Sequence, residues 1–312
     1  NNRKSNYHNI FKSFRIIISL PSSNENDNII YAYLQVFFDI SLTKVLSCVI
    51  IPLKGEYIVF FDTHAHYDDV AFDEDRDELI SSLPSSGVSL VVDPGSDMQS
   101  SRDSIALADR YGFVYSAVGV HPHEAKSMAD SDFDELRTMS LHSKVCAIGE
   151  IGLDYHYDFS PRDIQKKRFY DQLCLASELD LPVIIHEREA CRDTLDIIAP
   201  FKDITGVFHC YSGSWETAKI ILDKGWYLSF TGAITFKNAR HGPEVVSKMP
   251  RDRIMIETDS PYMAPVPVRG TRNSSKNLEF ICRRAAELMH ITIEEAASLT
   301  MENGKKFFGI LL

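Results

Sequence analysis

The stretch Tyr57-Ile58-Val59-Phe60-Phe61-Asp62-Thr63-His64-Ala65-His66 joins a short apolar run to a dense group of polar side chains. A near-continuous apolar run of this length is typical of a parallel strand that is covered on both faces. The same type of run recurs along the rest of the chain. The predicted strands are Tyr57–Phe61, Ser89–Val92, Phe113–Val120, Val145–Ile148, Pro182–Ile185, Gly206–Phe208, Trp226–Phe230 and Arg253–Ile256.

The segments between these runs have the pattern of amphipathic helices. Ser160-Pro161 followed by Asp163 is a typical helix start, and apolar residues then recur at helical spacing from Ile164 to Leu179. Strands and helices that alternate over about 250 residues predict an α/β fold, the (β/α)8 TIM barrel. An open doubly wound sheet is the alternative, but no G-x-G-x-x-G turn follows the first strand, as a dinucleotide-binding sheet would require.

Residues 1–56 differ from this pattern. We expect them to form an N-terminal extension that the mature protein need not contain, ahead of a single domain at 57–312. The apolar stretch from Ile29 to Leu53 is about long enough to cross a bilayer. Asp39 and Lys44 interrupt it, however, and each would cost roughly 2.5–3.5 kcal/mol near the centre of a membrane helix. We therefore expect no stable membrane partner.

Charge and cysteine content limit the function further. The 312 residues carry a formal net charge of −11, so we expect no broad basic face that coats nucleic acid. A local site in which metal ions supply the positive charge is compatible with this balance. The cysteines are scattered without a C-x-x-C pair, which argues against a disulfide framework or a zinc ribbon. Together with the lack of an export signal, they lead us to expect a cytoplasmic protein.

Polar side chains stand at the end of every predicted strand. In a barrel these ends meet on one face, where active sites lie. A single histidine at a strand end is usually structural, but histidines and carboxylates at several ends indicate a common site. The strand-end groups are Asp62-Thr63-His64-Ala65-His66, Asp93-Pro94-Gly95-Ser96, His121-Pro122-His123-Glu124, Gly149-Glu150, His186, His209, Thr231-Gly232 and Glu257-Thr258-Asp259.

These residue types predict a metal centre. His64 and His66 point the same way on a strand and can bind one ion. Imidazole and carboxylate ligands without thiolate suit Zn²⁺, Mn²⁺ or Mg²⁺. Two ions need a bridging ligand, and Glu150 lies between the His64/His66 pair and the His186/His209 pair in the order of the strands. Asp259 is the candidate for the carboxylate that binds an ion and accepts a proton from the attacking water.

Six motifs follow one another along the chain. They are Phe61-Asp62-Thr63-His64-Ala65-His66, Val118-Gly119-Val120-His121-Pro122-His123, Ile148-Gly149-Glu150-Ile151-Gly152-Leu153-Asp154-Tyr155, Ile185-His186-Glu187-Arg188, Phe208-His209-Cys210-Tyr211-Ser212-Gly213 and Glu257-Thr258-Asp259-Ser260-Pro261-Tyr262. Together they resemble the motifs of the TatD family of metal-dependent deoxyribonucleases, within the amidohydrolase superfamily. The resemblance covers about residues 60–310.

The resemblance implies a (β/α)8 barrel, dependence on two divalent ions, and hydrolysis of DNA phosphodiesters by a 3′-to-5′ exonuclease that acts on DNA ends or short single strands. It implies catalytic roles for Asp259 and Glu150. It also implies that His64, His66, Glu150 and Asp259 hold one ion, and that Glu150, His186 and His209 hold the other. By the same resemblance, His121 contacts the substrate phosphate, with Tyr155, Arg188 and the Ser212-Gly213 turn as further candidates.

Several residues keep two interpretations. Tyr155 either contacts substrate or packs on the rim, Arg188 either contacts substrate or pairs with a carboxylate such as Glu189, and Glu257 either orients a ligand or only ends a strand. We interpret His123, His142, His156 and His241 as structural or solvent-facing. After the last strand the family commonly has Arg-Asn-Glu-Pro, whereas this chain has Arg272-Asn273-Ser274-Ser275.

Two other functions remain open at this point. A related metallohydrolase could act on a non-DNA ester or amide, such as an aminoacyl-tRNA, with the same barrel and the same ions, because fold does not fix substrate. A binding protein that has lost its activity is a third possibility, but no predicted ligand is missing from the chain.

Overall fold

The computed structural model of the protein describes residues 58–310, which form an eight-stranded parallel sheet in the order β1 to β8. This confirms the predicted barrel and its strand order. The predicted extension at 1–56, and with it the domain boundary, lies outside the described residues. The strands are β1 (Phe60–Asp62), β2 (Val88–Pro94), β3 (Val114–Val118), β4 (Val145–Asp154), β5 (Val183–Arg188), β6 (Gly206–Phe208), β7 (Tyr227–Phe230) and β8 (Ile254–Ile256).

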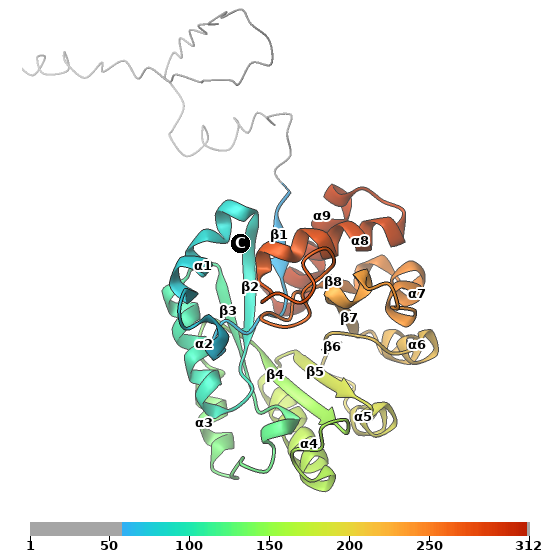
Figure 1. Cartoon of the computed structure of the whole chain (residues 1–312). Coiled ribbons are helices and arrows are strands. Elements are labelled where there is room, and N and C mark those ends of the chain that lie inside the picture. Colours follow the sequence, from blue (N-terminus) through green and yellow to red (C-terminus); the bar gives the residue numbers. More distant parts are fainter. Residues whose placement is uncertain (1–57, 311–312) are drawn as a thin grey trace, which may run out of the picture. The chain divides into compact units, whose positions relative to one another are not determined.

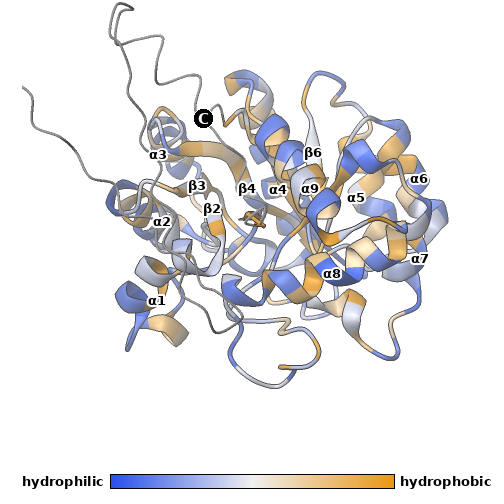
Figure 2. Cartoon of the chain, turned by 90° about the horizontal axis from the view of Figure 1, so that it is seen from above, coloured by the Kyte–Doolittle hydropathy of each residue, from blue (hydrophilic) through white to orange (hydrophobic). Residues whose placement is uncertain are grey.

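Helices surround the strands as an outer layer (Figure 1). They carry both hydrophilic and hydrophobic residues, as expected for elements with one face on the core and one in solvent (Figure 2). Between residues 58 and 310, no helix is long and apolar enough to cross a membrane. The α-helices are α1 (Arg76–Ser82), α2 (Met98–Arg110), α3 (Asp132–Met139), α4 (Arg162–Leu179), α5 (Cys191–Ile198), α6 (Trp215–Asp223), α7 (His241–Lys248), α8 (Leu278–Met289) and α9 (Ile293–Phe308).

The barrel closes between its last and first strands. The Thr63 backbone N–H and hydroxyl both donate to the Ile256 carbonyl, over 3.4 and 3.1 Å. Beyond the strand ends, the Asp259 N–H donates to the His64 carbonyl over 2.9 Å. The turn after β8 is therefore fixed directly to the turn after β1, so that polar residues from both ends of the domain meet.

The amino end of the barrel is filled by apolar side chains. One buried cluster joins inward-facing strand residues such as Phe61 and Val92 to the end of α9. Phe308 lies with its ring centroid 5.9 Å from that of Phe61, and Phe307 packs 5.2 Å from Tyr227. The last helix thus seals this end, and polar strand-end groups occur at the other.

Strand β4 is longer than predicted. The sequence predicts that it ends at Ile148, but it continues to Asp154 and pairs with β5, with a register shift between Ile148 and Ile151. Gly152 has φ +147°, and a Cβ there would lie 1.9 Å from the His186 carbonyl oxygen. Glycine at this position allows β4 and β5 to approach each other, a condition that apolar patterning does not reveal.

Candidate metal centre

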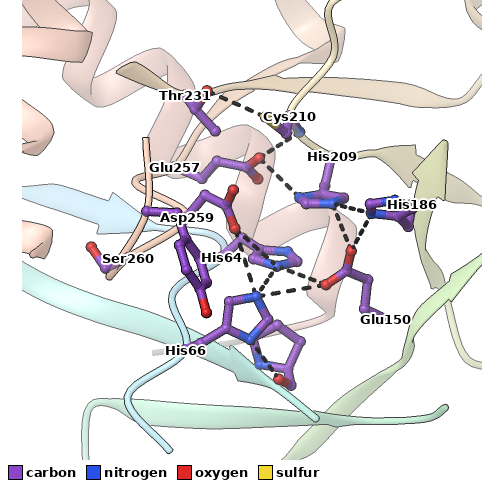
Figure 3. Close-up of polar contacts among 12 residues, drawn as sticks. His64, His66, Glu150, His186, His209, Cys210, Thr231, Glu257, Asp259 and Ser260 are labelled. Carbon is purple, nitrogen blue, oxygen red and sulfur yellow. Dashed lines mark hydrogen bonds and ion pairs between the residues drawn. The ribbon is translucent and has the colours of Figure 1, made fainter. Parts of the chain in front are cut away.

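Glu150 contacts both histidine pairs of the strand-end cluster (Figure 3). Its Oε2 atom is 3.3 Å from His64 Nε2 and 3.6 Å from His66 Nε2. Its Oε1 atom is 2.8 Å from both His186 Nδ1 and His209 Nε2. The two oxygens of this buried carboxylate thus face the two histidine pairs separately, which is the arrangement that a bridging ligand requires.

Asp259 adds a second carboxylate beside the His64/His66 pair. Its Oδ1 atom is 3.6 Å from His66 Nε2 and 3.9 Å from His64 Nε2. The residue has φ +55°, an uncommon conformation for a side chain other than glycine, and it is held there by the hydrogen bond to the His64 carbonyl. The six residues that were predicted to bind metal therefore lie together.

The outward nitrogen of three histidines faces a polar group behind the cluster. His66 Nδ1 lies 3.1 Å from the Pro94 carbonyl and His186 Nε2 lies 3.1 Å from Asp154 Oδ2. His209 Nδ1 is 3.4 Å from Glu257 Oε1, but without hydrogen-bond geometry. Such partners fix the orientation of a histidine and leave its other nitrogen as the ligand atom.

The contacts of Glu257 favour the interpretation that it orients a ligand rather than only ending a strand. Besides its approach to His209, its Oε1 accepts the Cys210 N–H over 2.6 Å and its Oε2 accepts the Ser229 hydroxyl over 2.6 Å. It is buried at the end of β8 with both oxygens engaged. Glu257 therefore positions the turn that carries His209.

The electrostatics of the cluster favour a cation. Burial opposes ionisation of Glu150, but the charge of His209 and hydrogen bonds from His121 and His186 hold its pKa well below the usual value. Burial also opposes a charge on His66, yet the hydrogen bond to Asp259 and the charges of Glu150 and Asp259 raise its pKa to about 10. The negative carboxylates keep neighbouring imidazoles protonated, and a metal ion can take the place of those protons. The donor atoms thus fit one or more divalent ions.

His121 lies closer to the cluster than a substrate contact alone would require. Its Nε2 atom is 3.5 Å from Glu150 Oε1, and His121, Glu150 and His186 offer donor atoms within 4.8 Å of one another. Burial and the charge of His186 lower the pKa of His121 to about 3, so its ring is neutral. A neutral imidazole at this position can donate a hydrogen bond to a phosphate or bind a metal ion.

Tyr155 and Arg188 lie on the rim rather than in the cluster. The Tyr155 hydroxyl donates to Asp193 Oδ2 over 2.6 Å. Arg188 is exposed, and its guanidinium lies 4.8 Å from the centroid of the Tyr157 ring. The alternative pairing of Arg188 with Glu189 does not form, because Glu189 accepts from His156 instead. Ser212 and Gly213 directly precede Ser214, which caps α6.

Asp154 is a further candidate for the site, to which the sequence analysis assigns no role. Its buried carboxylate accepts from His186 over 3.1 Å and from His123 over 2.8 Å. Hydrogen bonds from His186, from the Tyr157 backbone and from His123 offset the effect of burial and lower its pKa. The predicted strand stops at Ile148, and for this reason Asp154 was not placed beside β5. Its spacing of four residues from Glu150 is the signal that a longer strand would have revealed.

The loop that departs from the family pattern supports the turn that carries Asp259. The Asn273 side chain donates to the Thr258 carbonyl over 2.9 Å, and the Thr258 N–H and hydroxyl donate to Asp62 over 2.8 and 2.6 Å. Ser275 accepts a hydrogen bond from Tyr67 over 2.8 Å. Asn273 and Ser275 are fully buried, so this loop is part of the framework of the site.

The chain is similar in sequence to known proteins. A family model described as "TatD related DNase" matches residues 61–309. The uncharacterised metal-dependent hydrolase YabD of Bacillus subtilis is 42% identical over 254 residues, which cover 81% of this chain and 100% of the relative. A protein named 3′-5′ ssDNA/RNA exonuclease TatD, from Cronobacter sakazakii, is 36% identical over 222 residues, which cover 70% of this chain and 84% of the relative.

Solved structures show the same architecture. The crystal structure of YJJV, a TatD homologue from Escherichia coli, superposes with a TM-score of 0.77 at 27% sequence identity, covering 82% of this chain and 100% of that one. The match of the family model over most of the chain confirms the resemblance drawn from the six motifs. This chain belongs to the TatD family of metal-dependent hydrolases.

Proposed function

We propose that this protein is a deoxyribonuclease that removes nucleotides from the 3′ end of single-stranded DNA, with two divalent ions on either side of Glu150. The observation that carries the proposal is the division of the Glu150 carboxylate, with one oxygen toward His64 and His66 and the other toward His186 and His209. A single-ion site would not need a carboxylate whose oxygens serve two separate donor sets.

In this proposal each residue has a defined role. His64, His66 and Asp259 would hold one ion and His186 and His209 the other, and Glu150 would be shared between them. Mg²⁺, Mn²⁺ or Zn²⁺ bound there would lower the pKa of water and stabilise negative charge on the phosphate. Asp259 accepts the proton of the attacking water, since it is the carboxylate beside the first histidine pair that is not shared.

The remaining contacts align the substrate. Neutral His121 donates to a phosphate oxygen next to Glu150. Arg188 contacts a phosphate farther along the strand, where the rim is open to solvent, and Tyr155, whose hydroxyl already donates to Asp193, makes a weaker contact there. The exonuclease name of the Cronobacter sakazakii relative supports a nucleic-acid substrate. The net charge of −11 supports action at ends rather than tight binding along a duplex.

The test is cleavage of end-labelled single-stranded DNA by metal-stripped protein titrated with Mg²⁺, Mn²⁺ and Zn²⁺. Glu150→Ala is the inactive variant, and Glu178→Ala, which changes an exposed glutamate on α4, is the matched control. The expected result is stepwise shortening from the 3′ end that needs metal and that only Glu150→Ala abolishes. Metal uptake without cleavage of DNA, alongside turnover of an aminoacyl ester, would overturn the proposal.

A further inference from the structure

Two large aromatic side chains are exposed beside the metal centre. Tyr157 and Phe159 retain 47% and 55% of their accessible surface, although most aromatic residues between 58 and 310 are buried or half-buried. Their rings stack, with centroids 5.2 Å apart and planes 24° apart. With Arg188, whose guanidinium lies 4.8 Å from the Tyr157 centroid, they form what we call the aromatic shelf. Exposed rings are costly in water, and a cluster of them indicates a binding surface.

Only the His123 side chain separates the aromatic shelf from the histidines of the metal centre. Tyr157 and Phe159 belong to the loop after β4 and Arg188 is the last residue of β5, so all three lie at the carboxyl end of the strands. His123 packs edge-on against both rings, with its centroid 5.4 Å from Tyr157 and 4.8 Å from Phe159. The same ring lies 4.3 Å from His121 and 6.1 Å from His186. A nucleotide whose phosphate reaches His121 therefore has its base within reach of the shelf.

Hydrogen bonds to the end of β4 and to the segment after β3 hold the loop that carries Tyr157 and Phe159. Asp154 Oδ1 accepts the Tyr157 N–H over 2.9 Å. The Lys126 ammonium donates to the Phe159 carbonyl over 2.8 Å. The Ser160 hydroxyl donates to the His123 carbonyl over 2.8 Å. Because the rings are already in place, a ligand that stacks on them does not have to order the loop.

We propose that the aromatic shelf binds an unpaired base of the nucleotide next to the scissile phosphate. Flat, exposed rings are the surface on which single-stranded nucleic acids stack, without preference for a particular base. Arg188 adds a positive charge that suits the neighbouring phosphate and can itself stack on a base. This inference rests on the proposed function, and it adds the position at which the substrate base is held.

Single-stranded oligonucleotides with a normal or an abasic nucleotide at the penultimate 3′ position test the shelf, with the protein loaded with metal. The readouts are binding, by fluorescence anisotropy, and cleavage, as kcat/KM. We expect the wild type to favour the normal oligonucleotide by roughly 5- to 150-fold in both readouts, the range that stacking of about 1–3 kcal/mol per base gives. In Tyr157→Ala/Phe159→Ala this ratio should fall to about one.

Two further variants separate the shelf from general damage to the fold. Tyr170→Ala removes a ring that is 49% exposed on α4, and its ratio should remain that of the wild type. Tyr157→Trp keeps an aromatic face and should keep the preference. If Tyr157→Ala/Phe159→Ala kept the wild-type preference for the normal over the abasic oligonucleotide, the proposed role of the aromatic shelf would be wrong.

The outcomes also distinguish the shelf from the proposed function. Cleavage of both oligonucleotides at equal rates by the wild type would reject the shelf and leave the nuclease intact. A shelf-dependent preference in binding without cleavage would reject the nuclease and retain the shelf. A wild type that neither binds nor cleaves either oligonucleotide would reject both.

Discussion

The amino end of the barrel buries apolar side chains, whereas its carboxyl end buries histidines and carboxylates. At the amino end, Phe61 packs on Phe308 in a wholly apolar cluster, which close packing explains by itself. At the carboxyl end, Glu150 and His64 are equally buried, although burying a charge costs free energy unless it is paired. Close packing does not explain why charged and polar side chains are buried at the carboxyl end, so these residues indicate a functional site.

The largest expected effect at the carboxyl end is that of Glu150→Ala. Because this carboxylate contacts both histidine pairs, its loss should abolish hydrolysis. This effect is larger than the roughly 10–100-fold loss of activity that is typical when a residue hydrogen-bonded to a metal ligand is changed. The metal content of the variant, measured by mass spectrometry, should fall while its circular dichroism stays that of a folded barrel. Full activity with a normal metal content would show that the cluster is not the catalytic centre.

The corresponding change at the amino end is Phe308→Ala. Phe308 is buried against Phe61 and Phe307, so we expect the free energy of unfolding to fall by about 3–5 kcal/mol. Urea denaturation measures this loss. Folded Phe308→Ala should bind as much metal as the wild type, and a lower metal content at a temperature where it is folded would contradict the separation of the two ends.

Glu257→Gln tests the support behind the metal centre. The substitution keeps the size of the side chain but removes the charge that faces His209 Nδ1. We expect metal affinity to fall about 10–100-fold, as for other partners of ligating histidines. Competition with a chelator measures the change, and Ser229→Ala, which removes one hydrogen bond to the same carboxylate, should have a smaller effect. An unchanged affinity in Glu257→Gln would make Glu257 purely structural.

The smallest effect is expected on the rim, for Tyr155→Phe. The hydroxyl already donates to Asp193, so it contributes little to substrate binding, and KM should rise less than about tenfold, as for loss of one ordinary hydrogen bond. Steady-state kinetics on single-stranded DNA give this value. An increase of well over tenfold would place the Tyr155 hydroxyl on the scissile phosphate instead.

The convergence of the histidines and carboxylates could be predicted from the sequence, because the strand ends of a barrel meet on one face. His64 and His66 are two residues apart, which fixes a common face on a strand, and His186 and His209 each end an apolar run. In a parallel barrel such ends converge regardless of the details of packing. The positions of these residues at strand ends were therefore enough to predict that their side chains lie together in the barrel.

The parts that could not be predicted depend on contacts between distant strands. The glycines around Glu150 suggest a turn, and only the pairing with β5 shows that β4 continues to Asp154. The approach of His121 to Glu150 and the exposed stacking of Tyr157 on Phe159 likewise depend on how loops fold over the barrel. Sequence spacing carries no direct information on either contact.

The proposed two-ion centre is tested most directly by anomalous diffraction from crystals of the protein loaded with Mn²⁺. We predict two anomalous peaks about 3.5–4 Å apart, one on each side of the Glu150 carboxylate. One peak should lie among His64, His66 and Asp259, and the other beside His186 and His209. A single peak at saturating Mn²⁺, or two peaks that do not share Glu150, would contradict the bridging role of this residue.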